Sequence, residues 1–174
     1  IIEIRDFGIE QGRVYFAMEF IDGEDLKSMV DDGIRYSAPL PWQELIPLFL
    51  DVCEALEYCH KQGVIHRDLK PQNILIERVS QRAILADFGL MKLATRSDES
   101  SADTAQLTKT GEMVGTLAFM GPEQFSRGGS YGDIDTHTDI WSLGVSLFYC
   151  LTGIPPFNFA TPIEIFQAIS QNTT

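Results

Sequence analysis

The sequence predicts an α+β fold in which one β-hairpin precedes a mainly helical body. Residues 1–21 alternate apolar and polar side chains around a Gln11-Gly12 turn, as two paired strands do. Between Gln43 and Gln62, apolar residues recur at steps of three and four, which is the period of a helix with one buried face. Residues 137–153 are apolar on nearly every side, so we expect a helix buried in the core.

Length and composition indicate a single folded domain. The chain has 174 residues, of which 44% are hydrophobic, and this is enough for one core. Its net charge of -12 argues against a nucleic-acid partner, because phosphate backbones attract lysine and arginine. Because no long uninterrupted apolar run occurs, we expect no membrane segment in these residues and a cytoplasmic location, with any membrane anchor lying outside them.

A short helix is expected between the hairpin and the long helix. The Asp22-Gly23 pair is typical of a turn, and residues 24–32 favour a helix after it. Gly33 and the later pair Pro39 and Pro41 then indicate a loop.

Two short strands are expected after Gly63, the residue that ends the long helix. The β-prone runs 73–77 and 83–88 flank a polar turn. Residues 91–112 are polar, and a loop of this length in a compact domain is usually functional or disordered. Residues 162–170 favour a final amphipathic helix.

The apolar helix at 137–153 should begin at a capping threonine, Thr136 or Thr138, and end at Gly153. The chain also has three cysteines, Cys53, Cys59 and Cys150. Each lies in an apolar helical pattern and no C-x-x-C pair occurs, so we expect small buried side chains in a reducing compartment.

The stretch VIHRDLKPQN, residues 64–73, brings an acid, cations and an amide close together. Transfer of a phosphoryl group from a nucleotide needs a carboxylate to accept a hydroxyl proton, oxygen ligands for a metal, and a cation near the moving group. By residue type, Asp68, Asp87, Asn73 and Lys70 fit these roles. Asp87 and Asn73 supply the hard oxygen ligands that magnesium prefers.

Three motifs resemble those of the protein kinase family. They are HRDLKPQN at 66–73, DFG at 87–89, and GPE at 121–123 where the family has A-P-E. Glycine in the third motif adds backbone freedom but leaves Glu123, the residue that the family pairs with a later arginine. We do not interpret this departure as a loss of function.

The resemblance covers the whole chain and implies a protein-kinase-like fold. Residues 1–174 would form one partial kinase domain, made mainly of the helical C-terminal lobe. Residues 1–21 would be the last strands of the N-terminal lobe and the hinge. Residues 22–174 would be the large lobe, truncated before its last helices.

The resemblance implies a role for each residue of the catalytic motifs. Asp68 would be the catalytic base, and Asn73 and Asp87 would be the ligands of Mg²⁺, with ATP as the phosphate donor. Lys70 would contact the transferring phosphate. A lysine two residues after Asp68 is typical of serine/threonine kinases, and Thr116 matches the threonine beside their acceptor pocket. The implied substrates are protein serine and threonine hydroxyls.

The resemblance also implies regulation by phosphorylation. Arg67 matches the arginine that binds a phosphorylated activation loop, through a strong charged pair. Thr108 and Thr110 are the best-placed candidate phosphosites. Their threonine pair, with the later PEQ triplet at 122–124, is similar to bacterial eukaryote-like, or Hanks-type, kinases.

Other positions match the nucleotide cleft and the interior of the family's domain. Met18 would be the gatekeeper, and Leu75 would pack beneath the adenine. The residues that would complete this ATP site are Glu19, Ile21 and Asp25, the first two through backbone groups and the third near the ribose. His66 and Phe88 match the hydrophobic spine, and Asp139 matches the aspartate that hydrogen-bonds the catalytic loop.

Part of the family's machinery is not found in these residues. Neither the glycine-rich pattern G-x-G-x-x-G nor a V-A-x-K lysine occurs in the sequence. We therefore expect that this chain alone is weakly active or inactive. The sequence leaves open whether the parent protein forms a dimer through other regions.

Two alternatives to a protein kinase remain at this stage. A pseudokinase or nucleotide-sensing scaffold would share the fold and act by binding partners, but the presence of Asp68, Asn73 and Asp87 argues for catalysis. A small-molecule phosphotransferase would also share it, but the long threonine-bearing loop and residues 115–123 suit a protein substrate.

Overall fold

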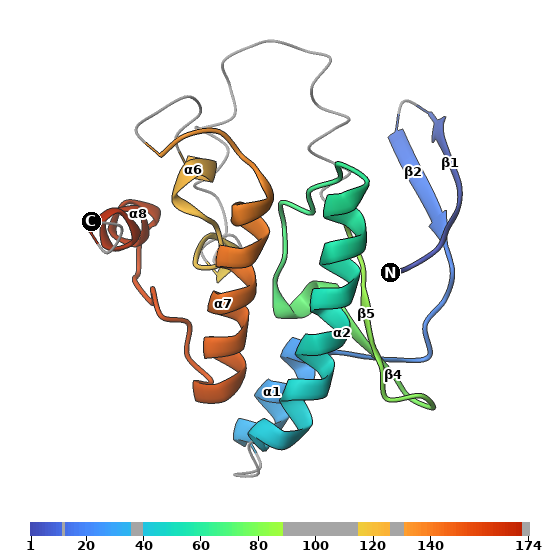
Figure 1. Cartoon of the computed structure of the whole chain (residues 1–174), viewed down its shortest axis with the longest axis horizontal. Helices are drawn as coiled ribbons and strands as arrows, with labels where there is room; N and C mark the ends of the chain where they lie inside the picture. The colour runs from blue at the N-terminus through green and yellow to red at the C-terminus, as the bar shows by residue number, and fades with distance from the viewer. Residues whose placement is uncertain (12, 36–39, 89–114, 126–130, 172–174) are drawn as a thin grey trace.

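A computed structural model describes residues 1–11, 13–35, 40–88, 115–125 and 131–171. Figure 1 shows two small sheets at one side of a group of helices. In chain order the elements are β1 (Ile4–Glu10), β2 (Arg13–Met18), β3 (Gly23–Asp25), α1 (Leu26–Arg35), α2 (Trp42–Lys61), the 3-10 helix η1 (Pro71–Asn73), β4 (Ile74–Glu77), β5 (Ala83–Leu85), α6 (Pro122–Phe125), α7 (Thr136–Thr152) and α8 (Pro162–Gln171). No helix in these ranges is long and apolar enough to cross a membrane.

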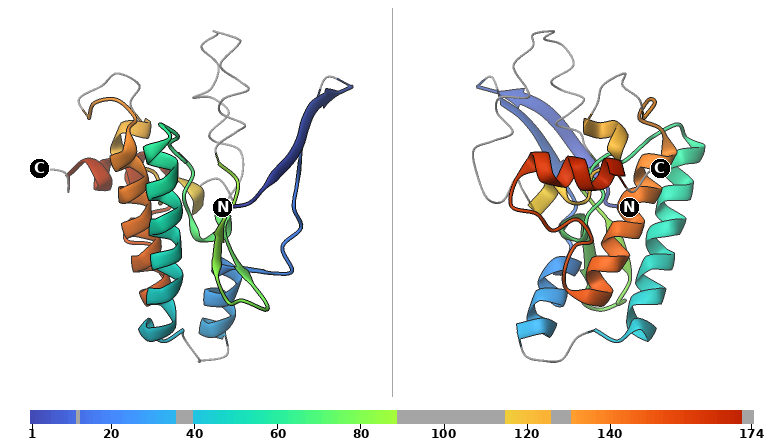
Figure 2. Two further views of the ribbon diagram at one scale, coloured as in Figure 1. Left: turned by 45° about the vertical axis from the view of Figure 1, so that its right-hand side comes forward. Right: turned by 90° about the vertical axis from the view of Figure 1, so that its left-hand side faces the viewer.

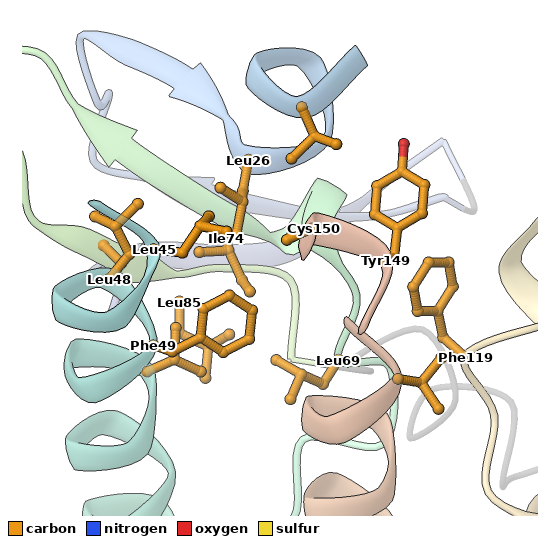
Figure 3. Close-up of a cluster of buried hydrophobic side chains, with 14 of the residues drawn as sticks. Leu26, Leu45, Leu48, Phe49, Leu69, Ile74, Leu85, Phe119, Tyr149 and Cys150 are labelled. Carbon is orange, nitrogen blue, oxygen red and sulfur yellow. The ribbon is translucent and has the colours of Figure 1, made fainter. Parts of the chain in front are cut away.

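The two long helices predicted from periodicity (43–62) and from apolar composition (137–153) are confirmed and form the centre of the fold. Helices α2 and α7 lie side by side in all views (Figures 1 and 2). Figure 3 shows the core, where Leu45 and Phe49 of α2 meet Ile74 and Leu85 of the strands. Burying each such side chain stabilises the fold by about 1.5–3 kcal/mol. This core fixes the chain segment that runs between α2 and β4.

The predicted hairpin is also present, as a two-stranded antiparallel sheet. β1 pairs with β2 from Ile4 opposite Met18 to Glu10 opposite Arg13. Large apolar side chains of this hairpin are exposed, Phe7 by 72% and Ile9 by 74%. The chain before β1 joins the second sheet, because the Ile2 N–H donates to the Leu85 carbonyl at 2.9 Å.

The region after the hairpin differs from the prediction of a turn at Asp22-Gly23 and a helix from 24 to 32. Gly23 to Asp25 form a third strand that pairs with β4, and Gly23 allows this approach because a Cβ there would lie 2.0 Å from the Ile76 carbonyl oxygen. Helix α1 starts only after Asp25, whose carboxylate accepts from the Ser28 N–H at 3.0 Å. The helix then continues through Gly33, where we expected a loop.

Helix α7 begins with a different cap from the predicted threonines. Its N-cap is Asp135, whose carboxylate accepts from the His137 N–H at 2.8 Å. The prediction of burial on every side is also wrong, because Ile140 and Phe148 are exposed by 53% and 46%. Apolar composition alone does not show which face of a helix its neighbours cover.

The expectation of three buried cysteines holds for two of them. Cys59 and Cys150 are buried, whereas Cys53 is exposed on α2. Burial raises the pKa of the Cys150 thiol to about 12. Cys150 is therefore a protonated core side chain at neutral pH, in keeping with its predicted packing role.

Two glycines of α7 give opposite predictions for stability. Gly153 ends the helix at φ 75°, where a side chain is strained, so Gly153→Ala should lower the free energy of unfolding by about 1–2 kcal/mol. A Cβ at Gly144 would meet open space inside the helix, so Gly144→Ala should raise it by about 0.5–1 kcal/mol. Equilibrium urea unfolding measures both changes. Equal effects of the two variants would contradict the assigned backbone conformations.

Candidate active site

The HRDLKPQN segment lies in the connection between α2 and β4. Helix α2 ends before Gly63, which has φ 72°, and the chain turns back as the Val64 N–H donates to the Cys59 carbonyl at 2.9 Å. Pro71 starts the short helix η1, where its missing N–H leaves no unpaired donor. Both ends of the segment are therefore attached to elements of the core.

The carboxylate of Asp139, at the first turn of α7, holds this loop. Its Oδ2 accepts from the His66 N–H and its Oδ1 from the Arg67 N–H, each at 2.9 Å. The Nε2 of His60, near the end of α2, lies 2.7 Å from Oδ2. A fully buried carboxylate needs such partners, because an unpaired buried charge is strongly destabilising. The expected hydrogen bonds between Asp139 and the HRDLKPQN segment are confirmed, and His60 is a further partner that the sequence did not indicate.

Arg67 has a backbone conformation that is unusual for its residue type. Its φ is 67°, in the left-handed region, which costs a non-glycine residue about 1–2 kcal/mol. Such conformations persist where the surroundings impose them, and they cluster at functional sites. Here Asp139 binds the N–H of Arg67, and Gln124 Nε2 donates to its carbonyl at 2.7 Å. Sequence reasoning missed Gln124, although the PEQ triplet that contains it was noted.

Asp68, Lys70 and Asn73 lie together in the loop, where Asn73 is buried and the other two side chains are partly exposed. Lys70 Nζ is 3.0 Å from Asp68 Oδ2, and Asn73 Nδ2 donates to the same oxygen at 3.2 Å. Asn73 Nδ2 also donates to the Asp68 carbonyl at 2.7 Å. Among the described residues, Asp68 Oδ1 has no hydrogen-bond partner. One oxygen of this carboxylate is thus held and the other can accept a proton.

Asp87 is brought next to this group by a backbone hydrogen bond. The Ala86 N–H donates to the Asn73 carbonyl at 2.9 Å, which places the following residue, Asp87, beside Asn73. Asp87 is exposed and has φ 53°, a second strained position at the site. Because Asn73 uses its Nδ2 as a donor to Asp68, its Oδ1 can face a cation. The two oxygen donors fit magnesium, which usually keeps several waters beside one or two protein ligands.

Histidine, cysteine and acidic residues do not gather into a separate metal site in the described ranges. No group of three or more such side chains could hold a metal ion there.

His66 links the loop to the strand end that carries Asp87. It is fully buried, its Nε2 lies 2.9 Å from the Ala86 carbonyl oxygen, and its Nδ1 accepts from the Asp68 N–H at 3.3 Å. These partners require the neutral ring with the proton on Nε2. Burial lowers the pKa of His66 accordingly. Its ring lies against Phe88, with centroids 4.6 Å apart, as the matched spine positions imply.

A pocket beside Asp68 extends toward Thr116. Its lining combines the HRDLKPQN segment with α7, α6 and the segment before α6. The lining residues are Arg67, Asp68, Leu69, Lys70, Thr116, Phe119, Met120, Gln124 and Ser142. The structure thus brings Thr116 to the same pocket as Asp68 and Lys70, although 46 or more positions of sequence separate them. Ser142 Oγ fixes this wall by donating to the Phe119 carbonyl at 2.9 Å.

The glycine of the GPE motif has a local structural effect. A Cβ at Gly121 would lie 2.5 Å from Glu123 Oε1, so the glycine leaves room for this carboxylate. Glu123 accepts a hydrogen bond from the Thr138 hydroxyl of α7. The motif is therefore attached to α7 in the described chain.

The residues matched to the nucleotide cleft are only partly brought together. Asp25 and Leu75 are cross-strand partners of β3 and β4. Met18 ends β2 opposite Ile4, and the Glu19 N–H donates to a carbonyl of the same hairpin end, which leaves the Glu19 carbonyl as its backbone acceptor. Ile21 lies in the connection to β3. The carboxylate of Asp25 bonds to Ser28 at the start of α1, so a ribose would compete for an oxygen that caps a helix.

The regulatory positions are divided between described and undescribed parts of the chain. Thr108 and Thr110 lie outside the described residues. Arg67 lines the pocket, and its guanidinium forms no ion pair within the ranges that the structure covers. The guanidinium of Arg67 is therefore a candidate group for binding an anion.

Acidification should destabilise the protein through His66. Its pKa is lowered in the folded state, so below its ordinary value of 6.5 the unfolded chain binds more protons than the folded one. Stability from the neutral ring is therefore present above that pH and is lost as the pH falls. Urea unfolding at about pH 7.5 and about pH 5 should show this loss, and His66→Gln should reduce it.

The matched control for that measurement is His137→Gln. This histidine is 87% exposed, so its replacement leaves the buried ring in place, and the loss on acidification should persist. A loss that is equal in His66→Gln and in the unmodified protein would contradict the assignment.

Comparison with known proteins agrees with this geometry. The protein kinase domain family matches residues 1–173. The chain is 37% identical over 151 residues to the serine/threonine-protein kinase PknB of Mycobacterium leprae, covering 87% of the chain and 22% of the relative. It is 35% identical over 170 residues to PknF of Mycobacterium tuberculosis, covering 96% of the chain and 33% of the relative.

A probable serine/threonine-protein kinase of Clostridium perfringens is 34% identical over 165 residues, which are 95% of the chain and 22% of that relative. The chain thus spans between about a fifth and a third of the length of these relatives. The chain belongs to the protein kinase domain family and is similar to its bacterial, Hanks-type serine/threonine members.

Proposed function

We propose that the chain is part of a serine/threonine protein kinase that transfers the γ-phosphoryl group of ATP to protein hydroxyls. The observation that supports this most is the arrangement of Asp68, with one oxygen held by Lys70 and Asn73 and the other without a partner among the described residues. Thr116 also lines the pocket at Asp68, and the resemblance to serine/threonine kinases implies that this threonine lies beside the acceptor.

In this proposal Asp68 acts as the base for the acceptor hydroxyl. The hydroxyl oxygen forms a bond to the γ-phosphorus as the bond from phosphorus to the bridging oxygen of ADP breaks, and the hydroxyl proton passes to Asp68 Oδ1. Lys70, 3.0 Å from Asp68 Oδ2, orients the carboxylate and places a positive charge near the transferring oxygens. The acceptor enters from the side of Thr116.

Asn73 and Asp87 would hold magnesium through Asn73 Oδ1 and the Asp87 carboxylate. When bound there, the ion would neutralise charge on the phosphate groups of ATP. The donor set supports this, because both ligands are hard oxygens and the amide of Asn73 is turned by its two bonds to Asp68. Met18, Glu19, Ile21, Asp25 and Leu75 are the proposed ATP contacts.

Regulation by phosphorylation, the location of the protein and the activity of the isolated chain are further parts of the proposal. A phosphate on Thr108 or Thr110 would pair with Arg67, which lines the acceptor pocket. The proposed location is cytoplasmic, and the proposed substrates are proteins with serine or threonine acceptors. Because the glycine-rich loop and the V-A-x-K lysine do not occur in this sequence, the isolated chain is proposed to be weakly active or inactive. Residues 1–174 form one partial domain in this account.

The proposal is tested by transfer of labelled phosphate from ATP and magnesium to a generic basic protein, with the full-length protein. Asp68→Asn should lower the rate by at least about 100-fold, because the proton acceptor is lost. Binding of ATP should persist in this variant. Asp133→Asn, which removes an exposed carboxylate before α7, is the matched control and should keep full activity.

Equal rates for the unmodified protein and a folded Asp68→Asn variant would refute the role of Asp68. No transfer by a folded protein whose threonine loop is phosphorylated would favour a nucleotide-sensing scaffold instead.

A further inference from the structure

The peptide unit that joins Arg67 to Asp68 is held at both of its polar atoms. Its carbonyl oxygen, on Arg67, accepts from Gln124 Nε2 at 2.7 Å. Its N–H, on Asp68, donates to His66 Nδ1 at 3.3 Å. The longer and weaker of these two bonds is the one from within the loop, so the contact from Gln124 is the stronger constraint on this peptide. The orientation of this peptide sets the direction in which the Asp68 side chain leaves the backbone.

Gln124 uses both ends of one amide to join two walls of the pocket. Its Oε1 accepts from the Gly121 N–H at 3.0 Å, while its Nε2 binds the Arg67 carbonyl. Gly121 follows the segment that carries Thr116, and Thr116 and Asp68 line the same pocket. One side chain therefore fixes the distance between the wall on the acceptor side and the loop with the carboxylate.

The chemistry of this position selects an amide. A glutamate would keep the acceptor for Gly121 but would place a carboxylate oxygen against the carbonyl oxygen of Arg67. A lysine or arginine would donate to Arg67 but would leave the Gly121 N–H without its acceptor. The strained φ of 67° at Arg67 makes this donor more important, because a conformation of this kind persists only where neighbouring groups hold it.

We propose that Gln124 is a positioning residue that aligns Asp68 with the acceptor hydroxyl by fixing the Arg67 peptide. The inference rests on the proposed function, in which Asp68 takes the proton. Because the two hydrogen bonds of Gln124 go to the Arg67 peptide and to Gly121 and none goes to a proposed nucleotide contact, its loss affects the chemical step and leaves nucleotide binding intact.

The test compares Gln124→Glu and Gln124→Met in the full-length protein. The first keeps the shape and the acceptor for Gly121 and removes the donor, whereas the second keeps the length and removes both. Each variant should lower kcat by about tenfold to 100-fold, because a misplaced catalytic group loses rate steeply. The KM for ATP should stay within about twofold of the unmodified value, since no nucleotide contact changes.

Gln81→Glu is the matched control. Gln81 Nε2 also donates to an arginine carbonyl, that of Arg78, at 2.8 Å, but in an exposed turn between β4 and β5. The same chemical change there should leave kcat unchanged. A fall in kcat in this control equal to that of Gln124→Glu would overturn the proposal, because the effect would then be independent of the site.

Hydrogen exchange separates this inference from the proposed function. The Asp68 amide should exchange faster in both Gln124 variants than in the unmodified protein and in Gln81→Glu, whether or not the unmodified protein transfers phosphate. Faster exchange without any phosphate transfer by the unmodified protein would refute the proposed function and keep the positional role. Unchanged exchange and unchanged kcat in the folded variants, or loss of the folded state in both, would overturn the role of Gln124.

Discussion

The buried carboxylate of Asp139 is the constraint on which the site depends. It accepts the N–H groups of His66 and Arg67, and the imidazole of His60 lies against the same oxygen. A carboxylate that is buried away from water needs hydrogen-bond donors. The loop therefore has to present two consecutive N–H groups to the two oxygens of Asp139. This requirement gives Arg67 its left-handed backbone conformation and fixes the backbone position from which the Asp68 side chain extends.

The arrangement also explains why distant elements are needed for one short loop. Asp139 comes from α7, His60 from α2, and Gln124 from α6, and each is joined to the loop only in the folded chain. The hydrophobic core between α2, the strands and α7 holds these helices at fixed positions (Figure 3). The polar contacts then differentiate the two oxygens of Asp68, because Lys70 and Asn73 both bind Oδ2. Hydrophobic packing therefore positions the loop between the helices, and hydrogen bonds orient the side chains of the loop.

Several parts of this structure could be predicted from the sequence because local patterns determine them. The helical period predicted α2, the apolar composition of residues 137–153 predicted α7, and the alternation predicted the hairpin. The resemblance to the kinase motifs predicted that Asp68, Asn73 and Asp87 are neighbours. Strand β3 was missed because Gly23 to Asp25 have no β propensity, and they become a strand only by pairing with β4.

Other features depend on tertiary contacts that no local pattern records. Thr136 and Thr138 are good capping residues, yet the chain enters α7 with Asp135 in the extended conformation that a cap requires. Cys53 follows the apolar pattern of α2 but lies on its exposed side. The amide of Gln124 binds a carbonyl 57 positions away, so its role could be found only once α6 had been placed against the loop.

The most direct test of this account is the kinetic effect of Asp139→Asn in the full-length protein, with nucleotide affinity measured alongside. An asparagine keeps the shape but replaces one carboxylate oxygen by a donor that faces another donor. The account predicts that kcat falls at least about tenfold while the affinity for ATP and magnesium stays within about twofold. A folded Asp139→Asn protein with unchanged kcat would contradict the claim that this buried carboxylate sets the geometry of the site.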